Sequence, residues 1–186
     1  MPKTIYLITK NKMKVLLAQS AINDKDLKIE QFSVETPEIQ SLDVKEIVKY
    51  SAKWAAEKFQ KPVLKMDSSL WIEALGGFPG PFTAYTDKSI GREGIMKLME
   101  GVRKRTAKFI TAVAFCQPGR EPIVEISELK GKICNKLEGK YGWFSDFFFI
   151  PQGYKKPMGC YSDETRKKIW PQDCWKRIAL RIKCLK

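Results

Sequence analysis

Residues 61–81 read KPVLKMDSSLWIEALGGFPGP, and this stretch decides how the fold is predicted. Pro62-Val63-Leu64 is typical of a short buried strand, which delivers Asp67, Ser68 and Ser69 at its carboxyl end. Open α/β sheets place their functional residues at such strand ends. The glycines and prolines that close the stretch are too dense for regular structure and predict a defined loop.

The segments before this stretch predict alternating strands and helices. Apolar residues from Lys3 to Ile8 indicate a strand, and the polar turn after them leads into a helix that ends near Ile22. A second strand is expected over residues 27–34 and a helix over 43–59. This order favours an α/β fold.

The segments after this stretch are expected to continue the same domain. We expect a helix over residues 90–99, a β-hairpin, a further strand, an aromatic stretch and a basic helix or pair of helices interrupted at Pro171. The hairpin strands are 109–116 and 123–129, the further strand is 130–135, the aromatic stretch is 142–151 and the helical end is 163–186. Without a visible repeat or linker, residues 1–186 are predicted to form a single domain.

Composition limits the chemistry that is possible. The chain has 34 Lys and Arg against 21 Asp and Glu, a net charge of +13, which favours polyanionic partners such as nucleotides or nucleic acid. It has no histidine, so histidine-based nucleophilic catalysis and histidine-ligated metals are excluded. The five cysteines form no C-x-x-C pair, and no run of about 18 apolar residues occurs. We expect a reduced, cytoplasmic protein without a membrane segment.

A first candidate site lies in the turn that follows the first strand. Thr9, Asn11 and Lys14 bring a hydroxyl, an amide and an ammonium group to a helix N-terminus, where backbone N–H groups attract phosphate. The alternative is an ordinary helix cap followed by a solvated lysine.

A second candidate site consists of two carboxylates at expected strand ends, Glu38 and Asp67. Mg²⁺ takes few protein ligands and fills its coordination shell with water and phosphate oxygens, so these two residues would suffice for a metal-bound polyphosphate.

A third candidate site lies in the aromatic stretch. The Trp143 ring can stack on a base, and the Asp146 carboxylate can accept hydrogen bonds from it. The alternative is that these aromatic residues belong to a strand in the core.

Taken together, these motifs resemble the Ham1 family of inosine triphosphate, or non-standard purine NTP, pyrophosphatases from Thr9 to about Tyr154. The family patterns are T-x-N-x-x-K, P-E-I/Y-Q, D-[ST]-x-L with A-L-G-G-[FL]-P-G-P, and G-[FW]-x-x-D…F-x-P-x-G-Y. The matching residues are Thr9, Asn11 and Lys14, then Pro37 to Gln40, then Asp67 to Leu70 with Ala74 to Pro81, and finally Gly142, Trp143, Asp146, Phe149, Pro151, Gly153 and Tyr154.

The resemblance implies a function and a set of roles. It implies a mixed twisted sheet in two lobes around a cleft, usually in a homodimer, that hydrolyses nucleoside triphosphates to monophosphate and pyrophosphate. Mg²⁺ would be held by Glu38 and Asp67, and Asp67 would activate the attacking water. The binding residues implied are Thr9, Asn11, Lys14 and Ser68 for phosphate and Trp143 and Asp146 for the base, with Arg166 as a further nucleotide-binding residue.

Several positions depart from the family pattern. Met66 replaces a second acid before Asp67, and Ser51 replaces a lysine on the helix after the P-E motif. The C-terminal S-H-R motif has no equivalent, and Trp170 or Trp175 would either cover the base or belong to the core. Lys176 or Arg177 would be the replacement cation. The alternative function is therefore a catalytically weak relative that binds nucleotide or RNA, with nucleic-acid binding less favoured than hydrolysis.

Overall fold

The strands form one mixed sheet, in which the first strand has a parallel neighbour on each side. In the computed structural model, which describes residues 2–185, β1 (Lys3–Ile8) pairs in parallel with β2 (Leu27–Phe32) and with β3 (Val63–Ile72). The sheet order among these described residues is β2-β1-β3-β5-β6-β7, and β4 pairs with β3. The remaining strands are β4 (Pro79–Gly80), β5 (Thr106–Cys116), β6 (Ile123–Ile133) and β7 (Phe149–Pro151).

Three of these strands are shared between two compact units. Unit 1 consists of Met1–Asp67, Thr111–Ser127 and Gln172–Lys186, and unit 2 consists of Ser68–Ile110 and Glu128–Pro171. Three of the four boundaries therefore fall inside β3, β5 and β6, and the fourth lies between residues 171 and 172, after α5 (Asp163–Ile169). Each unit has its own hydrophobic core.

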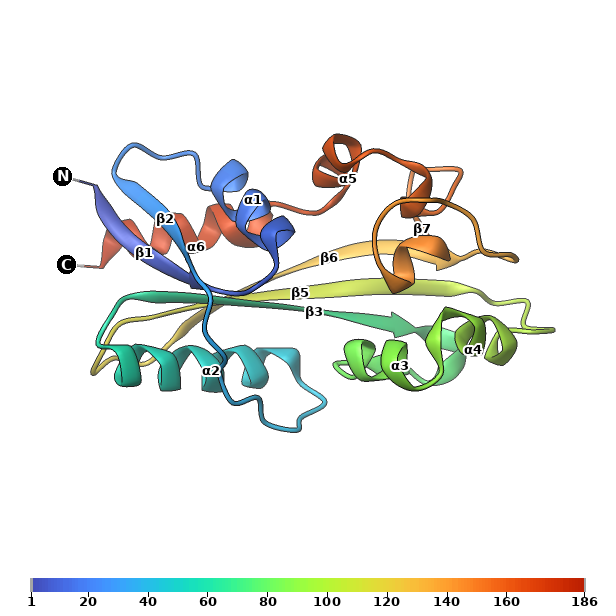
Figure 1. Cartoon of the computed structure of the whole chain (residues 1–186), viewed down its shortest axis with the longest axis horizontal. Coiled ribbons are helices and arrows are strands. Elements are labelled where there is room, and N and C mark those ends of the chain that lie inside the picture. Colours follow the sequence, from blue (N-terminus) through green and yellow to red (C-terminus); the bar gives the residue numbers. More distant parts are fainter. Residues whose placement is uncertain (1, 186) are drawn as a thin grey trace. The chain divides into compact units, whose positions relative to one another are not determined.

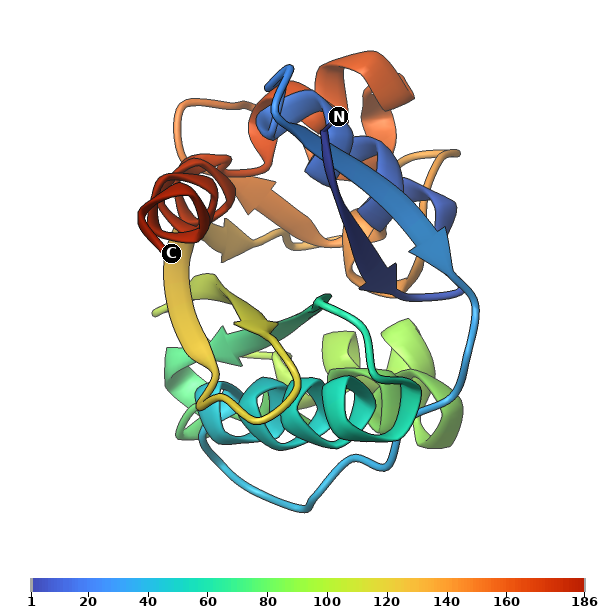
Figure 2. The ribbon, with the colours of Figure 1, turned by 90° about the vertical axis from the view of Figure 1, so that its left-hand side faces the viewer.

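Unit 1 carries three helices, α1 (Lys12–Ala21), α2 (Val44–Phe59) and α6 (Asp173–Cys184). Helix α2 begins where the Asp43 side chain accepts a hydrogen bond from the Lys45 amide at 2.9 Å, which satisfies a free N–H group of its first turn. Figure 1 shows α2 on one side of the strands of this unit and α1 with α6 on the other, and Figure 2 shows the same arrangement end-on.

The core of unit 1 follows from side-chain alternation along its strands. Leu7, Leu64 and Phe115 are fully or almost fully buried and belong to the same cluster as Trp175 of α6. Alternation sends the side chains between them to the opposite face, which is the side of α2. There β5 and α2 present mainly small side chains, Ala112 and Ala114 on the strand and Ala52, Ala55 and Ala56 on the helix, all at most 1% exposed.

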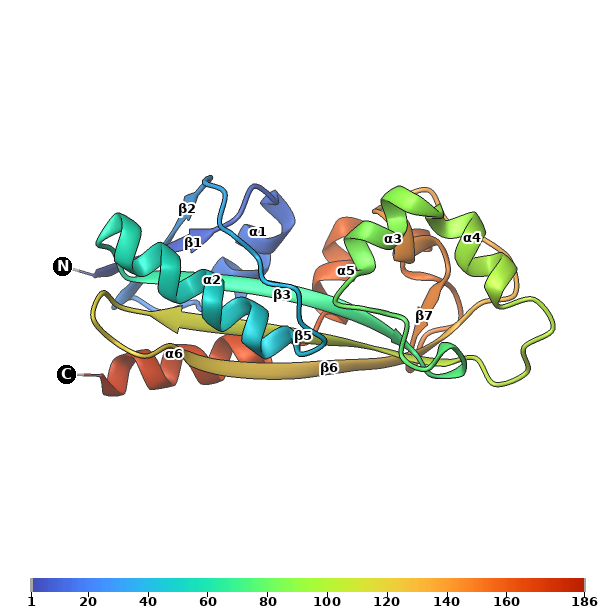
Figure 3. The same cartoon turned by 90° about the horizontal axis from the view of Figure 1, so that it is seen from below.

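Unit 2 contains short helices around a second core. These are α3 (Thr83–Ser89), α4 (Gly91–Leu98) and α5 (Asp163–Ile169), with the 3₁₀ helices η1 (Glu73–Leu75), η2 (Phe144–Phe147) and η3 (Met158–Cys160). Figure 3 shows α3 and α4 as consecutive short helices, and it shows β5 and β6 as a long hairpin. The core combines strand residues such as Leu70 and Phe109 with Phe148 and Phe149.

The structure differs from the expected elements at four places. The strand at Val63 is not short, because it continues as β3 to Ile72. The strands expected over 123–129 and 130–135 are one strand, β6. Residues 144–147 form a 3₁₀ helix, and helix α3 was not expected at all. Its start depends on a tertiary contact: Thr83 Oγ1 donates to the Gly80 carbonyl at 2.7 Å and accepts from the Leu70 amide at 2.9 Å.

No helix within residues 2–185 is long and apolar enough to cross a membrane. The five cysteines are free thiols.

Thiol reactivity should follow burial. Cys184 is exposed, whereas Cys116 is 1% exposed and burial raises the pKa of its thiol to about 11. Because the thiolate is the reactive form, iodoacetamide at pH 8 is expected to modify Cys184 first and to spare Cys116, Cys134 and Cys174. Peptide mass spectrometry after timed labelling measures this. Labelling in urea is the control, in which all five should react, and equal native rates for Cys116 and Cys184 would contradict the burial.

Candidate active site

The turn between β1 and α1 is organised by two of the predicted binding residues. Thr9 Oγ1 accepts a hydrogen bond from the Asn11 amide at 3.0 Å, and Asn11 Oδ1 accepts one from the Met13 amide at 2.8 Å. Asn11 is therefore the N-cap of α1, as the alternative interpretation expected. These bonds fix the turn, and Thr9 lines the pocket beside it.

The lysine of the same motif is not a solvated side chain. Lys14 Nζ donates a hydrogen bond to the Met66 carbonyl oxygen at 3.0 Å and lies 3.7 Å from Asp67 Oδ1. Both side chains of this ion pair are about three-quarters buried. The helix thus brings Lys14 to the predicted catalytic carboxylate, 53 residues later in the chain.

Asp67 lies within β3 and not at a strand end, which corrects the expectation for this residue. The strand continues past Asp67 because the hydroxyl of the buried Ser69 has hydrogen-bond partners. Ser69 Oγ donates to the Ile110 carbonyl at 3.3 Å and accepts from Trp71 Nε1 at 2.8 Å. Ser68, the predicted phosphate ligand after Asp67, is half-buried in the same strand.

Glu38 also lies outside regular structure rather than at a strand end. It belongs to the loop between β2 and α2, and two side-chain anchors hold this loop close to it. Ser51 Oγ of α2 donates to the Pro37 carbonyl at 2.8 Å. Lys65 Nζ of β3 donates to Thr36 Oγ1 at 2.9 Å and lies 3.1 Å from Glu38 Oε1.

Sequence reasoning missed Lys65, although a signal for it exists. A lysine inside the apolar run that forms β3 is unusual, and its spacing of two from Asp67 puts both side chains on the same face of the strand.

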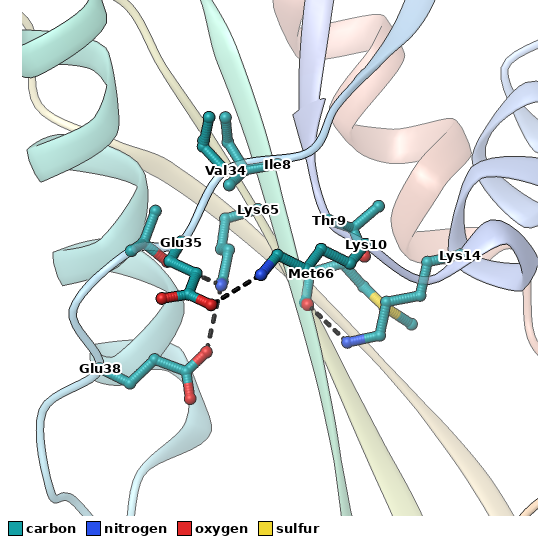
Figure 4. A pocket seen from close by; sticks show the side chains of 10 residues that line it. Ile8, Thr9, Lys10, Lys14, Val34, Glu35, Glu38, Lys65 and Met66 are labelled. Atoms are coloured by element: carbon teal, nitrogen blue, oxygen red, sulfur yellow. Dashed lines mark hydrogen bonds and ion pairs between the residues drawn. The ribbon is translucent and has the colours of Figure 1, made fainter.

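Of the residues described above, Thr9, Lys14, Glu38 and Lys65 line one pocket of unit 1, with a volume of about 310 Å³. Figure 4 shows three lysines converging on it from different elements: Lys10 from the turn after β1, Lys14 from α1 and Lys65 from β3. Two glutamates complete its charged lining, Glu38 and Glu35, and the latter accepts a hydrogen bond from Lys10 at 2.6 Å. The pocket thus offers ammonium groups to an anion and carboxylates to a cation.

The predicted base-side residues lie in unit 2, where they form a second polar group. Asp146 Oδ2 accepts hydrogen bonds from the Trp143 amide at 2.8 Å and from Arg166 Nη1 at 2.7 Å. Arg166 Nη2 also donates to Asp163 at 2.5 Å, and its Nε is buried without a partner among the described residues. The indole of Trp143 is half exposed, which leaves it free to stack on a ligand.

Burial and hydrogen bonding act in opposite directions on the pKa of Asp146. Burial raises the pKa of the Asp146 carboxyl above its ordinary value, while the Trp143 amide and Arg166 act in the opposite direction. The Asp146 and Arg166 side chains can pack directly against the backbone at residue 142 because that residue is glycine. A Cβ atom there would lie 1.9 Å from Asp146 Oδ2 and 2.2 Å from Arg166 Nη1.

The sequence pattern of the Ham1 family matches residues 5–172. The chain belongs to the Ham1 family. Its relatives include proteins named dITP/XTP pyrophosphatase from Methanopyrus kandleri, 41% identical over 77% of this chain and 76% of the relative, and from Ignicoccus hospitalis, 33% identical over 90% and 89%. A third, from Korarchaeum cryptofilum, is 43% identical over 75% and 73%.

Solved structures confirm the mixed α/β fold of this Ham1 family member. The Ham1 protein of Staphylococcus aureus aligns with a TM-score of 0.82 at 21% identity, covering 99% of this chain and all of the other. A HAM1 protein from Coxiella burnetii aligns with a TM-score of 0.83 at 22% identity, covering 97% and 98%.

The donor set of this Ham1 chain fits a hard cation. Glu38 and Asp67 offer carboxylate oxygens, and Mg²⁺ commonly takes one or two carboxylates while water and substrate phosphates supply the rest. Within residues 2–185 no group of three or more His, Cys, Asp and Glu is arranged to hold a metal. Met66, which replaces the second acid, is a core residue, and its carbonyl oxygen is bonded to Lys14. The residues thus fit a metal that arrives with a polyphosphate.

Of the C-terminal tryptophans of this Ham1 chain, Trp175 is a core residue and Trp170 is a partly buried residue packed against a core. Trp175 is 1% exposed in the core of unit 1, and Trp170 packs against Phe109 at a ring distance of 5.0 Å in unit 2. Of the two candidate replacement cations, Arg177 is bonded to Glu125 at 2.8 Å, and Lys176 is exposed.

Proposed function

We propose that this protein hydrolyses the non-standard purine nucleoside triphosphates ITP, dITP and XTP to nucleoside monophosphate and pyrophosphate, with Mg²⁺ as cofactor. One observation carries the proposal: the Lys14–Asp67 ion pair lies beside a pocket lined by lysines and by Glu38. Phosphoryl chemistry requires mainly positioning and charge neutralisation, which such a set of side chains supplies without histidine. The names of the Ham1 relatives support the same reaction.

In the proposed mechanism, unit 1 handles the triphosphate and the attacking water. Lys10 and Lys14 bind phosphate oxygens, with Thr9 and the turn capped by Asn11 beside them. Glu38 and Asp67 would hold Mg²⁺, which when bound neutralises phosphate charge. Asp67 accepts a proton from the water that attacks the α-phosphorus, and the bond to the bridging oxygen breaks to release pyrophosphate.

Unit 2 would recognise the base. In this proposal Trp143 stacks on the purine ring, and the buried Asp146–Arg166 pair provides fixed polar groups for its edge. The buried Nε–H of Arg166 has no partner among the described residues, and a 6-oxo group is an acceptor that hypoxanthine, xanthine and guanine offer but adenine does not. Ser68 would contact a phosphate.

The family resemblance also supports a cytoplasmic homodimer. Light scattering after size-exclusion chromatography tests this part of the proposal, because a dimer has twice the chain mass of 21.4 kDa.

The direct test is pyrophosphate release from ITP, dITP, XTP, ATP, GTP and dUTP. With Mg²⁺ we expect release from the first three at rates at least about tenfold above that from ATP, because adenine lacks the 6-oxo acceptor and a single lost hydrogen bond to a built site costs that much or more. Guanine has the same 6-oxo group, so GTP measures whether the site distinguishes the purines by any other contact. EDTA should abolish release because, without Mg²⁺, the carboxylates of Glu38 and Asp67 repel the negatively charged triphosphate. No release from any nucleotide would reject the proposal.

The second candidate, a catalytically weak nucleotide- or RNA-binding relative, is motivated by the net charge of +13. Salt-dependent RNA binding that survives Asp67→Asn, together with no pyrophosphate release, would favour it.

A further inference from the structure

Lys65 is an ammonium group in an unusual position. Its side chain is only 12% exposed, although it projects from a strand of the central sheet. A buried ammonium is costly unless it is paired, and its two partners here are Thr36 Oγ1 and Glu38 Oε1. Glu38 is itself 55% exposed, so the buried partner of this ion pair is the lysine.

The partner of Lys65 is also the residue whose carboxylate is needed for a cation. An ammonium group has three N–H donors, and only two are directed at Thr36 and Glu38. Once the Glu38 carboxylate turns to a cation, a second donor of Lys65 loses its partner. Lys65 lines the same pocket as Lys10 and Lys14. A phosphate oxygen bound there would accept a hydrogen bond from the donor that has lost its partner.

We propose that Lys65 is a phosphate-binding residue of the unit 1 pocket, held in place by Glu38 until a polyphosphate enters. The inference rests on the proposed function, because it takes that site to bind a nucleoside triphosphate. Two anchors beside Glu38, the Ser51 contact to Pro37 and the Lys65 contact to Thr36, keep the loop in position while the carboxylate exchanges partners.

The test measures binding of inorganic tripolyphosphate in EDTA by calorimetry, so that neither metal nor hydrolysis contributes. Lys65→Gln is expected to weaken binding about tenfold or more, because a charge-assisted hydrogen bond is lost. Lys65→Arg should restore affinity to within about threefold. Lys108→Gln is the matched control, since it removes a lysine paired with Glu128 outside the pocket, and it should stay within about twofold.

A second arm asks whether Glu38 restrains Lys65. Glu38→Gln should tighten metal-free tripolyphosphate binding several-fold in the wild-type background, because it removes a carboxylate and releases the ammonium. The gain should be clearly smaller in the Lys65→Gln background. Thermal melts verify folding, and Lys65→Met, which keeps the aliphatic stem, replaces Lys65→Gln if the latter is unfolded.

Each contrary result overturns the inference. These results are no saturable binding by the wild type, a Lys65→Gln affinity within about twofold of wild type, equal gains from Glu38→Gln in both backgrounds, or a Lys65→Arg variant as weak as Lys65→Gln. The proposed function has a separate readout. If the protein releases pyrophosphate but Lys65→Gln does not change tripolyphosphate affinity, only this inference is rejected. If tripolyphosphate binding depends on Lys65 but no pyrophosphate is released, only the proposed enzymatic function is rejected.

Discussion

Asp67→Asn is expected to reduce pyrophosphate release from dITP by about a thousandfold, within the range that a general base contributes. The substitution removes both a proton acceptor and one of the two carboxylates that fit Mg²⁺. It should not weaken metal-free tripolyphosphate binding, because it removes a negative charge 3.7 Å from Lys14 Nζ. The two measurements together separate a loss of chemistry from a loss of phosphate binding.

Asp173→Asn is the matched control for this change. Asp173 is an exposed aspartate in the first turn of α6, away from the pocket, and the variant should release pyrophosphate at the wild-type rate within about twofold. If Asp67→Asn retained a tenth or more of the wild-type rate, Asp67 would not be the catalytic base.

Gly142→Ala should be one of the most destabilising single substitutions in unit 2, lowering the free energy of unfolding by about 3–5 kcal/mol. The added methyl group would overlap Asp146 Oδ2 and Arg166 Nη1, so both ends of the buried ion pair must shift, and the expected cost is that of losing their contact. The backbone at this position has a φ of +92°, which an alanine adopts only with strain. Urea unfolding followed by tryptophan fluorescence measures the change.

Gly153→Ala separates backbone strain from the steric overlap. Its φ is +85°, but nothing lies within 4 Å of an added Cβ atom. Its cost should therefore be limited to the strain, about 1–2 kcal/mol. Equal costs for the two variants would mean that the Asp146–Arg166 pair adapts to the methyl group.

Local patterns predicted the fold where each element could be recognised without its neighbours. The strand, polar turn and helix at the N-terminus are predicted from apolar spacing alone, and the mixed α/β fold is confirmed. The length of β3 was not predictable in this way. Asp67 and the serines after it interrupt the apolar run. The Ser69 hydroxyl and the Leu70 amide find their partners outside the strand, at the Ile110 carbonyl and at Thr83 Oγ1.

The site was predictable as a set of motifs but not as a network. Thr9, Lys14 and Glu38 do line one pocket, while their roles in binding remain predictions. Lys65 belongs to no motif, so only the structure reveals that its ammonium reaches Glu38. The C-terminal tryptophans illustrate the opposite case, since an indole that could cover a base was indistinguishable from a core residue until burial was known.

The loop that carries Glu38 has a consequence for how ligand binding can be observed. Among the described residues from 33 to 42, only the Val34 amide donates a hydrogen bond to a backbone carbonyl. The loop is therefore held by side-chain hydrogen bonds rather than by backbone hydrogen bonds to a neighbouring strand. Its amide protons should therefore exchange with deuterium quickly in the free protein. Slower exchange there on adding nucleotide would register occupancy of the pocket, independently of any turnover.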